Sequence, residues 1–178
     1  VHAYDIKQIT EAIHFKRAMD IPNMVIVGGA DAHLVTDLLK ENNVSVMVRR
    51  LHSLPRFPET DGDEPYRVPA ILEEAGVLYC LENSGDMEQM GTRNLPFYAG
   101  TAVAYGLDYE KAVQAMTLNT AKILGIDAQM GSLEVGKDAT LFISKGDALD
   151  MRSNDVSHAF IQGRSIDLDN RQLQLYRK

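Results

Sequence analysis

Side chains able to act as acids, bases or ligands follow four segments of this sequence, each where a strand could end. They are, in chain order, His2, the pair Asp31 and His33, the group Arg49, Arg50 and His52, and the run Glu82, Asn83, Ser84 and Asp86. Where parallel strands alternate with helices, the loops that follow the strands gather at one edge of the sheet and carry the functional groups. We therefore expect these four groups to face a common pocket.

The first two groups have structural explanations as well as functional ones. A lone histidine such as His2 is usually a surface residue or one satisfied by a hydrogen bond. Gly28 and Gly29 either let a loop approach a ligand or simply turn the chain into a helix, which Asp31 can cap. His33 falls in the first turn of that helix, so its imidazole points either at solvent or at the strand ends.

The other two groups lie in longer loops. Residues 49–66 form a loop of the length typical of lids and binding loops. Its mixed charges are typical of a solvated face, but Arg49, Arg50 and His52 stand at the strand exit, where they can meet a substrate carboxylate. A side-chain turn explains Asn83 and Ser84, whereas a carboxylate in the run 82–86 can serve as a general base or a metal ligand.

Helices and strands alternate along the first 126 residues. Helical spacing of apolar residues occurs at 5–19, 32–40, 68–75, 95–105 and 108–124, and short apolar runs occur at 24–27, 44–48 and 77–81. Such runs, separated by amphipathic helices, predict a parallel sheet covered by helices. Near Asp127 the pattern changes to glycine turns and short segments at 140–144 and 158–161, which predicts a small separate β-domain.

Composition narrows the functional classes. The net charge is −7 and the 18 Lys and Arg residues are scattered, which argues against a nucleic-acid partner. No apolar run reaches the length of a membrane span, so we expect a soluble protein without a membrane partner. The sequence does not decide the cellular compartment, which is cytoplasmic, or extracytoplasmic if a longer parent chain carries a signal peptide for export. The single cysteine, Cys80, lies in an apolar run and is expected to be a buried, inert thiol rather than a nucleophile.

Four blocks in the C-terminal part resemble the amidohydrolase superfamily, in particular the imidazolonepropionase-like branch of metal-dependent hydrolases. The blocks are NLP at 94–96, AYGL at 104–107, TLNTAKILG at 117–125 and GSLEVGKDA at 131–139. Weaker similarity extends back to His2. The resemblance implies that residues 1–126 are the second half of a TIM-type (β/α)8 barrel. Residues 127–178 would then be part of a small, composite β-sandwich-like domain.

The resemblance also implies a site. Enzymes of this family hold one or two divalent metal ions, most often zinc, which activate water for attack on an amide carbonyl. His2 corresponds to the metal-binding histidine of the fifth strand, and Asp86 lies closest to the catalytic aspartate of the eighth. The substrate-binding candidates are Arg49, His52, Asn83 and Ser84. The implied reaction is hydrolysis of a carbon–nitrogen bond in a small cyclic or acyl amide that is not a peptide.

Two departures from the family pattern leave two hypotheses open. Gly28 and Gly29 stand where the histidine of the sixth strand is expected, and Ser84 stands near the position of the aspartate. Under the first hypothesis the chain is part of an active hydrolase whose metal is held only in a longer protein. This chain alone would then be inactive and would associate with itself or with the missing N-terminal half, because a half barrel has open sheet edges. Under the second, it is a catalytically degenerate homologue with a binding or scaffold role.

Overall fold

A parallel sheet forms the N-terminal part of the protein. The structure is a computed structural model that describes residues 1–83 and 88–178. Four strands pair in chain order, all parallel: β1 (His2–Ala3), β2 (Met24–Gly28), β3 (Val44–Arg49) and β4 (Tyr79–Glu82). The prediction of an α/β chain built on a parallel sheet is confirmed.

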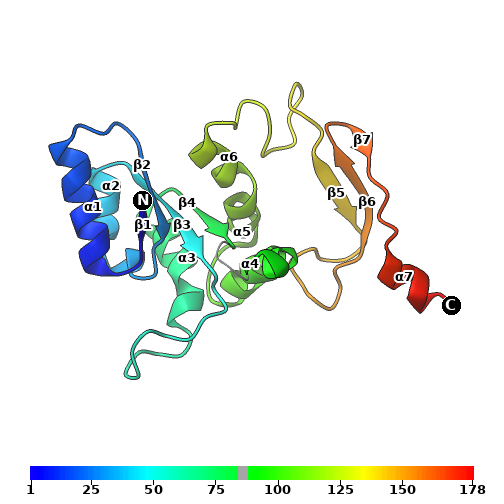
Figure 1. Cartoon of the computed structure of the whole chain (residues 1–178), viewed down its shortest axis with the longest axis horizontal. Helices are drawn as coiled ribbons and strands as arrows, with labels where there is room; N and C mark the ends of the chain where they lie inside the picture. Colours follow the sequence, from blue (N-terminus) through cyan, green and yellow to red (C-terminus); the bar gives the residue numbers. More distant parts are fainter. Residues whose placement is uncertain (84–87) are drawn as a thin grey trace.

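Helices pack on this sheet from two sides. They are α1 (Ile6–Ala18), the 3-10 turn η1 (Ala32–Leu34), α2 (Thr36–Glu41), α3 (Glu64–Ala75), the 3-10 segment η2 (Glu88–Asn94), α4 (Leu95–Ala104), α5 (Tyr109–Met116) and α6 (Leu118–Leu124). Helices α1 and α2 lie on the outer flank, and α4, α5 and α6 lie toward the C-terminal part (Figure 1). The core between sheet and helices is apolar and includes Ile9, Ile13, Ile26, Leu39, Val46 and Leu72.

Local signals explain where several helices begin and end. Asp5 caps α1, because its carboxylate accepts from the backbone N–H of Gln8 while the Gln8 side chain accepts from the backbone of Asp5. Gly76 ends α3 and Gly125 ends α6, both in the left-handed conformation that glycine adopts without strain. These three boundaries agree with the sequence prediction.

Three helices differ from the prediction. The segment 32–40 is not one helix, because the chain forms η1 and then α2. Likewise 108–124 divides at Thr117 into α5 and α6; the Thr117 hydroxyl donates to the Val113 carbonyl, and its backbone leaves the helical region. Helix α3 begins four residues earlier than predicted, with Pro65 in its first turn, where a missing N–H costs nothing.

The C-terminal part is a separate antiparallel sheet of β5 (Leu141–Ser144), β6 (Val156–Ile161) and β7 (Arg164–Ser165), followed by the short helix α7 (Arg171–Tyr176). The β character was predicted, whereas α7 was not. Within the fully described segment 127–178, Leu149 is the one buried residue. It packs against Gly100 of α4, where any added Cβ would collide with the Leu149 carbonyl.

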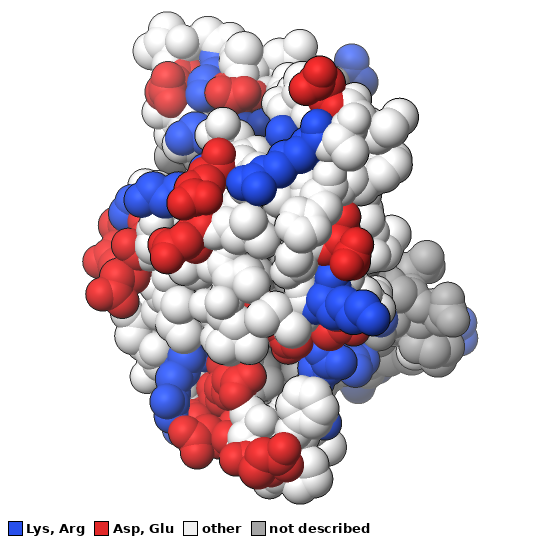
Figure 2. All heavy atoms as spheres, turned by 90° about the vertical axis from the view of Figure 1, so that its left-hand side faces the viewer, with Lys and Arg blue, Asp and Glu red and all other residues white. Residues whose placement is uncertain are grey.

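The outer flank carries both signs of charge. Figure 2 shows this face, with Lys and Arg interspersed among Asp and Glu rather than gathered into a stripe. Among the described residues, no helix is both long and apolar enough to cross a lipid bilayer.

Candidate functional site

The carboxyl ends of the four strands bring His2, Arg49 and Glu82 onto one edge of the sheet. The strand register aligns His2 with Val27, Met47 and Cys80 in one row across the sheet, and it aligns Arg49 with Glu82 two rows further toward the strand ends. Burial alternates along β2 and β3, so the helices cover one face fully and leave the face of Val27 and Met47 half-covered. His2, at the edge strand, is exposed on this second face.

Tyr4 connects the first strand to the third at this edge. Arg49 donates a hydrogen bond to the Tyr4 hydroxyl at 3.0 Å, and the guanidinium lies 5.9 Å from the ring centre. The Tyr4 ring also lies over Gly28, whose φ of +115° favours glycine. Tyr4 was not predicted as a site residue, although it lies two residues after His2 and strand alternation places it on the same face.

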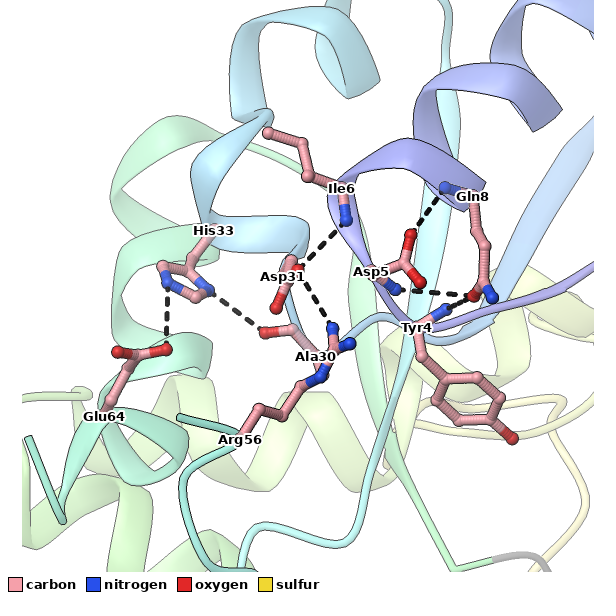
Figure 3. Close-up of polar contacts among 9 residues, drawn as sticks. All are labelled: Tyr4, Asp5, Ile6, Gln8, Ala30, Asp31, His33, Arg56 and Glu64. Carbon is pink, nitrogen blue, oxygen red and sulfur yellow. Dashed lines mark hydrogen bonds and ion pairs between the residues drawn. The ribbon is translucent and has the colours of Figure 1, made fainter. Parts of the chain in front are cut away.

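Asp31 is the centre of the polar network after β2 (Figure 3). It is buried, and its Oδ2 accepts from the backbone N–H of Ile6 and from Arg56, both at 3.0 Å. The predicted helix-capping role for Asp31 is wrong in detail, because its side chain makes no cap to η1. It instead satisfies the first turn of α1 and ties the loop 49–63 to the strand ends.

His33 belongs to the same network but faces α3. Its Nδ1 lies 3.2 Å from the Ala30 carbonyl and its Nε2 lies 3.6 Å from a carboxylate oxygen of Glu64, as Figure 3 shows. Of the two orientations predicted for this imidazole, toward solvent or toward the strand ends, neither describes it fully. It bridges the loop after β2 to the start of α3.

These contacts leave little space at the strand ends. A small cavity of about 50 Å³ lies between the loop after β2 and the loop 49–63, and its lining includes Asp31, Arg49 and Arg56. Small-molecule sites usually measure a few hundred Å³. In this chain by itself, the cavity has room for water but not for an organic substrate.

His52 lies apart from the strand-end cavity and packs against α4. Its Nε2 is 2.7 Å from the Thr101 hydroxyl, and its ring meets the Tyr98 ring edge-on at 4.7 Å between centres. Burial lowers the pKa of His52, so at neutral pH the imidazole is uncharged. Tyr98 and Thr101 are residues that the sequence analysis missed, since nothing in their helical segment distinguishes them from packing residues.

The fourth predicted group is only partly described. Ser84 and Asp86 lie outside the described residues. Asn83 lies near Gly91, since its Nδ2 would be 3.3 Å from a Cβ added to Gly91. Glu82 ends β4 with one carboxylate oxygen buried and, within the described part of the chain, without a hydrogen-bond partner.

The described residues do not by themselves make a metal centre. No three His, Cys, Asp or Glu side chains among them stand close enough to share an ion. Cys80, which shares the row of His2 but lies on the opposite edge strand, is buried as predicted, and burial raises the pKa of its thiol to about 11. His2 stays the candidate metal ligand among the residues described near the strand ends. The strand register places it on the half-covered face of the sheet.

Sequence comparisons show the family to which the chain belongs. The model of the Amidohydrolase family matches residues 12–166. Adenine deaminase 3 of Rhizobium meliloti is 24% identical over 143 residues, which are 78% of this chain and 23% of the relative. Imidazolonepropionase of Syntrophobacter fumaroxidans is 43% identical over 56 residues, covering 31% of this chain and 13% of the relative. The chain thus spans a quarter or less of these relatives.

Solved structures share the fold. An amidohydrolase from Thermotoga maritima superposes with a TM-score of 0.79 and 30% identity, over 93% of this chain and 42% of that one. An adenosine deaminase from Xanthomonas campestris with bound zinc superposes with a TM-score of 0.58 and 20% identity, over 99% of this chain and 48% of that one. At 20% identity the second likeness concerns the fold alone.

Proposed function

The chain belongs to the amidohydrolase family, and from this we propose that residues 1–126 form the second half of a TIM-type (β/α)8 barrel and residues 127–178 part of a composite β-domain. The order of the strands supports the proposal, because four parallel strands in chain order leave β1 and β4 as open edges. A barrel closes such edges, and an eight-stranded one needs about 250 residues. We infer that the edges pair with a missing N-terminal half or with a second copy of the chain.

The activity proposed for the completed protein is hydrolysis of a carbon–nitrogen bond in a small cyclic or acyl amide. The observation that carries this proposal is the alignment of His2, Tyr4, Arg49 and Glu82 at one edge of a parallel sheet in a chain of this family. Asp86 is the proposed catalytic carboxylate. Arg49, Asn83 and Ser84 are the proposed contacts to substrate, and His52 would act on substrate only from the side of α4.

The proposed cofactor is a divalent metal ion, zinc first, with His2 as the ligand contributed by the described part of the chain. Imidazole nitrogen is a common zinc ligand, and a bound zinc ion would supply activated water for hydrolysis. A single histidine does not hold zinc, and no three ligating side chains lie together among the described residues, so at least one further ligand would come from outside them. This chain alone is accordingly proposed to be inactive.

One observation favours the alternative, a catalytically degenerate homologue with a binding role. Tyr4 fills the space beside Gly28, the position where the family would place its next histidine, and its Cε1 would stand 2.6 Å from a Cβ there. A histidine at this position requires Tyr4 to move.

Metal content and activity of a protein that joins this chain to the proposed N-terminal half distinguish the two. The active hydrolase is expected to hold at least one zinc ion per chain, measured by plasma mass spectrometry, and to hydrolyse members of a cyclic and acyl amide panel. His2→Asn should lower the zinc content, whereas His14→Asn, at an exposed position of α1, should not. Protein that holds no zinc and stays inactive after zinc addition would overturn the hydrolase proposal and leave the binding role.

A further inference from the structure

A second and larger hollow lies away from the strand ends, between α4 and the loop that joins β5 to β6. Its volume is about 380 Å³, within the range of small-molecule sites. We call it the α4 cleft. It is lined by His52, Phe97, Gly100, Thr101, Val103, Ala104, Tyr105, Tyr109, Asp147, Leu149, Asp150 and Met151.

Aromatic rings form much of the wall of the α4 cleft. Tyr105 and Tyr109 are 38% and 40% exposed, so part of each residue is accessible to a ligand. Tyr105 is fixed from behind by Tyr66, whose ring centre lies 5.0 Å away, and Tyr66 in turn meets His52 edge-on. The wall is therefore held by packing before any ligand binds, which lowers the entropic cost of binding.

Two carboxylates, those of Asp147 and Asp150, also line the cleft. Asp147 accepts a hydrogen bond from the Tyr109 hydroxyl at 2.7 Å and another from the backbone N–H of Leu149 at 2.8 Å. Asp150 accepts from the backbone N–H of Arg152 and the hydroxyl of Ser153, and these bonds lower the pKa of Asp150. The positive charge of Arg152 also acts on Asp150 and contributes to its lowered pKa. Asp147 is the carboxylate whose hydrogen bonds described here all come from neutral groups.

Positive charge is missing from the wall. Among the described residues, neither Lys nor Arg lines the cleft. Arg67 acts electrostatically on Tyr105, but both of its contacts at 2.6 Å go to the Asp63 carboxylate.

His52 adds no positive charge at neutral pH. The Thr101 hydroxyl donates to the Phe97 carbonyl at 2.9 Å, so its oxygen is left to accept from the Nε2–H of His52 at 2.7 Å. This bond is satisfied by the neutral imidazole, and burial lowers the pKa of His52.

We propose that the α4 cleft binds a small organic cation, an ammonium group attached to an apolar body. The ammonium group would lie against the tyrosine faces and the two carboxylates, because aromatic faces and carboxylates both attract positive charge. The apolar body would cover Val103, Leu149 and Met151, of which Met151 is 65% exposed. An anion would meet two carboxylates at this place, and a neutral apolar compound would gain nothing from them.

Choline and its neutral isostere 3,3-dimethyl-1-butanol test the proposal on the 178-residue chain. The two compounds have the same shape and differ in charge, so the comparison isolates the attraction for a cation. Binding is measured by NMR titration of the methyl signals of the cleft. Choline is expected to bind at least about fivefold more tightly than the isostere, and acetate is expected not to bind. Equal affinity for choline and the isostere, or no shift with choline, would overturn the proposal.

Matched variants locate the site. Asp147→Asn keeps an acceptor for Tyr109 and Leu149 but removes the charge, and Tyr105→Leu removes an aromatic face; each is expected to weaken choline binding about fivefold. The controls are Asp155→Asn, an exposed acid outside the cleft lining, and Tyr176→Leu on α7, which is 88% exposed. If the controls weaken binding as much as the cleft variants, choline binds elsewhere and the assignment is wrong.

Discussion

The ring of Tyr4 occupies the space that a side chain on Gly28 would need. A Cβ added at Gly28 would lie 2.6 Å from Cε1 of Tyr4, and the φ of Gly28 is +115°. The edge of the sheet is thus packed around a glycine, and Tyr4 is held there by Arg49. The sequence and the structure agree that this position does not offer a metal ligand.

Gly28→Ala should therefore destabilise the fold. Positive φ costs an alanine about 1 to 2 kcal/mol, and the overlap with Tyr4 adds about 1 to 3 kcal/mol. Urea unfolding of Gly28→Ala, of Tyr4→Ala and of the double variant separates the two effects, because Gly28→Ala should cost less in the Tyr4→Ala background by the overlap alone. A Gly28→Ala chain as stable as the wild type would contradict the packing described here. Gly62→Ala is the control, since a Cβ there meets nothing within 4 Å.

Removal of Asp31 should lower the free energy of unfolding more than removal of its ion-pair partner Arg56. Asp31→Ala leaves the backbone N–H of Ile6 without its acceptor and is expected to cost about 1 to 3 kcal/mol of unfolding free energy. Arg56 is 41% exposed at its side chain, so Arg56→Ala should cost about 0 to 1 kcal/mol. Chemical denaturation measures both, with Glu74→Ala at an exposed position as control. Equal costs for the two variants would show that the Ile6 contact contributes nothing.

The parallel sheet could be predicted because its signals are local. Each strand is a short apolar run, each helix has apolar residues at helical spacing, and Gly76 and Gly125 end their helices by backbone conformation. The division of segment 108–124 into two helices at Thr117 could not be predicted from the sequence. Apolar spacing continues through this residue, and a single side-chain hydrogen bond accompanies the break. Helix α7 is short and wholly exposed, so it lacks the buried face on which such predictions depend.

The candidate site was predictable in position but not in contacts. Topology alone places His2 and Arg49 at one edge of the sheet. The direction of His52 depends on packing against Tyr98 and Thr101 of α4, about fifty residues away in sequence. No local pattern encodes such a contact, so sequence reasoning grouped His52 with Arg49.

Cys80 should react with thiol reagents only when the chain unfolds. Burial raises the pKa of its thiol to about 11, which lowers the thiolate fraction at pH 8 roughly 100-fold relative to an ordinary thiol. Reaction with Ellman's reagent should be slow in buffer and fast in concentrated urea, with one thiol counted per chain. Rapid reaction of the folded chain would show that Cys80 is accessible and would reopen its role as a nucleophile. Free glutathione under the same two conditions controls for the effect of urea on the reagent.

The stability of the chain should fall in mild acid partly because of His52. Its pKa is lower in the folded chain than the ordinary value of about 6.5, so the unfolded chain binds this proton more readily. The contribution of the neutral imidazole to stability is complete above about pH 6.5 and is lost as the pH falls through the folded value. His52→Gln keeps a donor for Thr101 but does not titrate, so its unfolding free energy should drop less between pH 7 and pH 5 than that of the wild type. His14→Gln, at an exposed position, should keep the wild-type drop. If His52→Gln loses as much stability as the wild type, burial against α4 does not perturb this histidine.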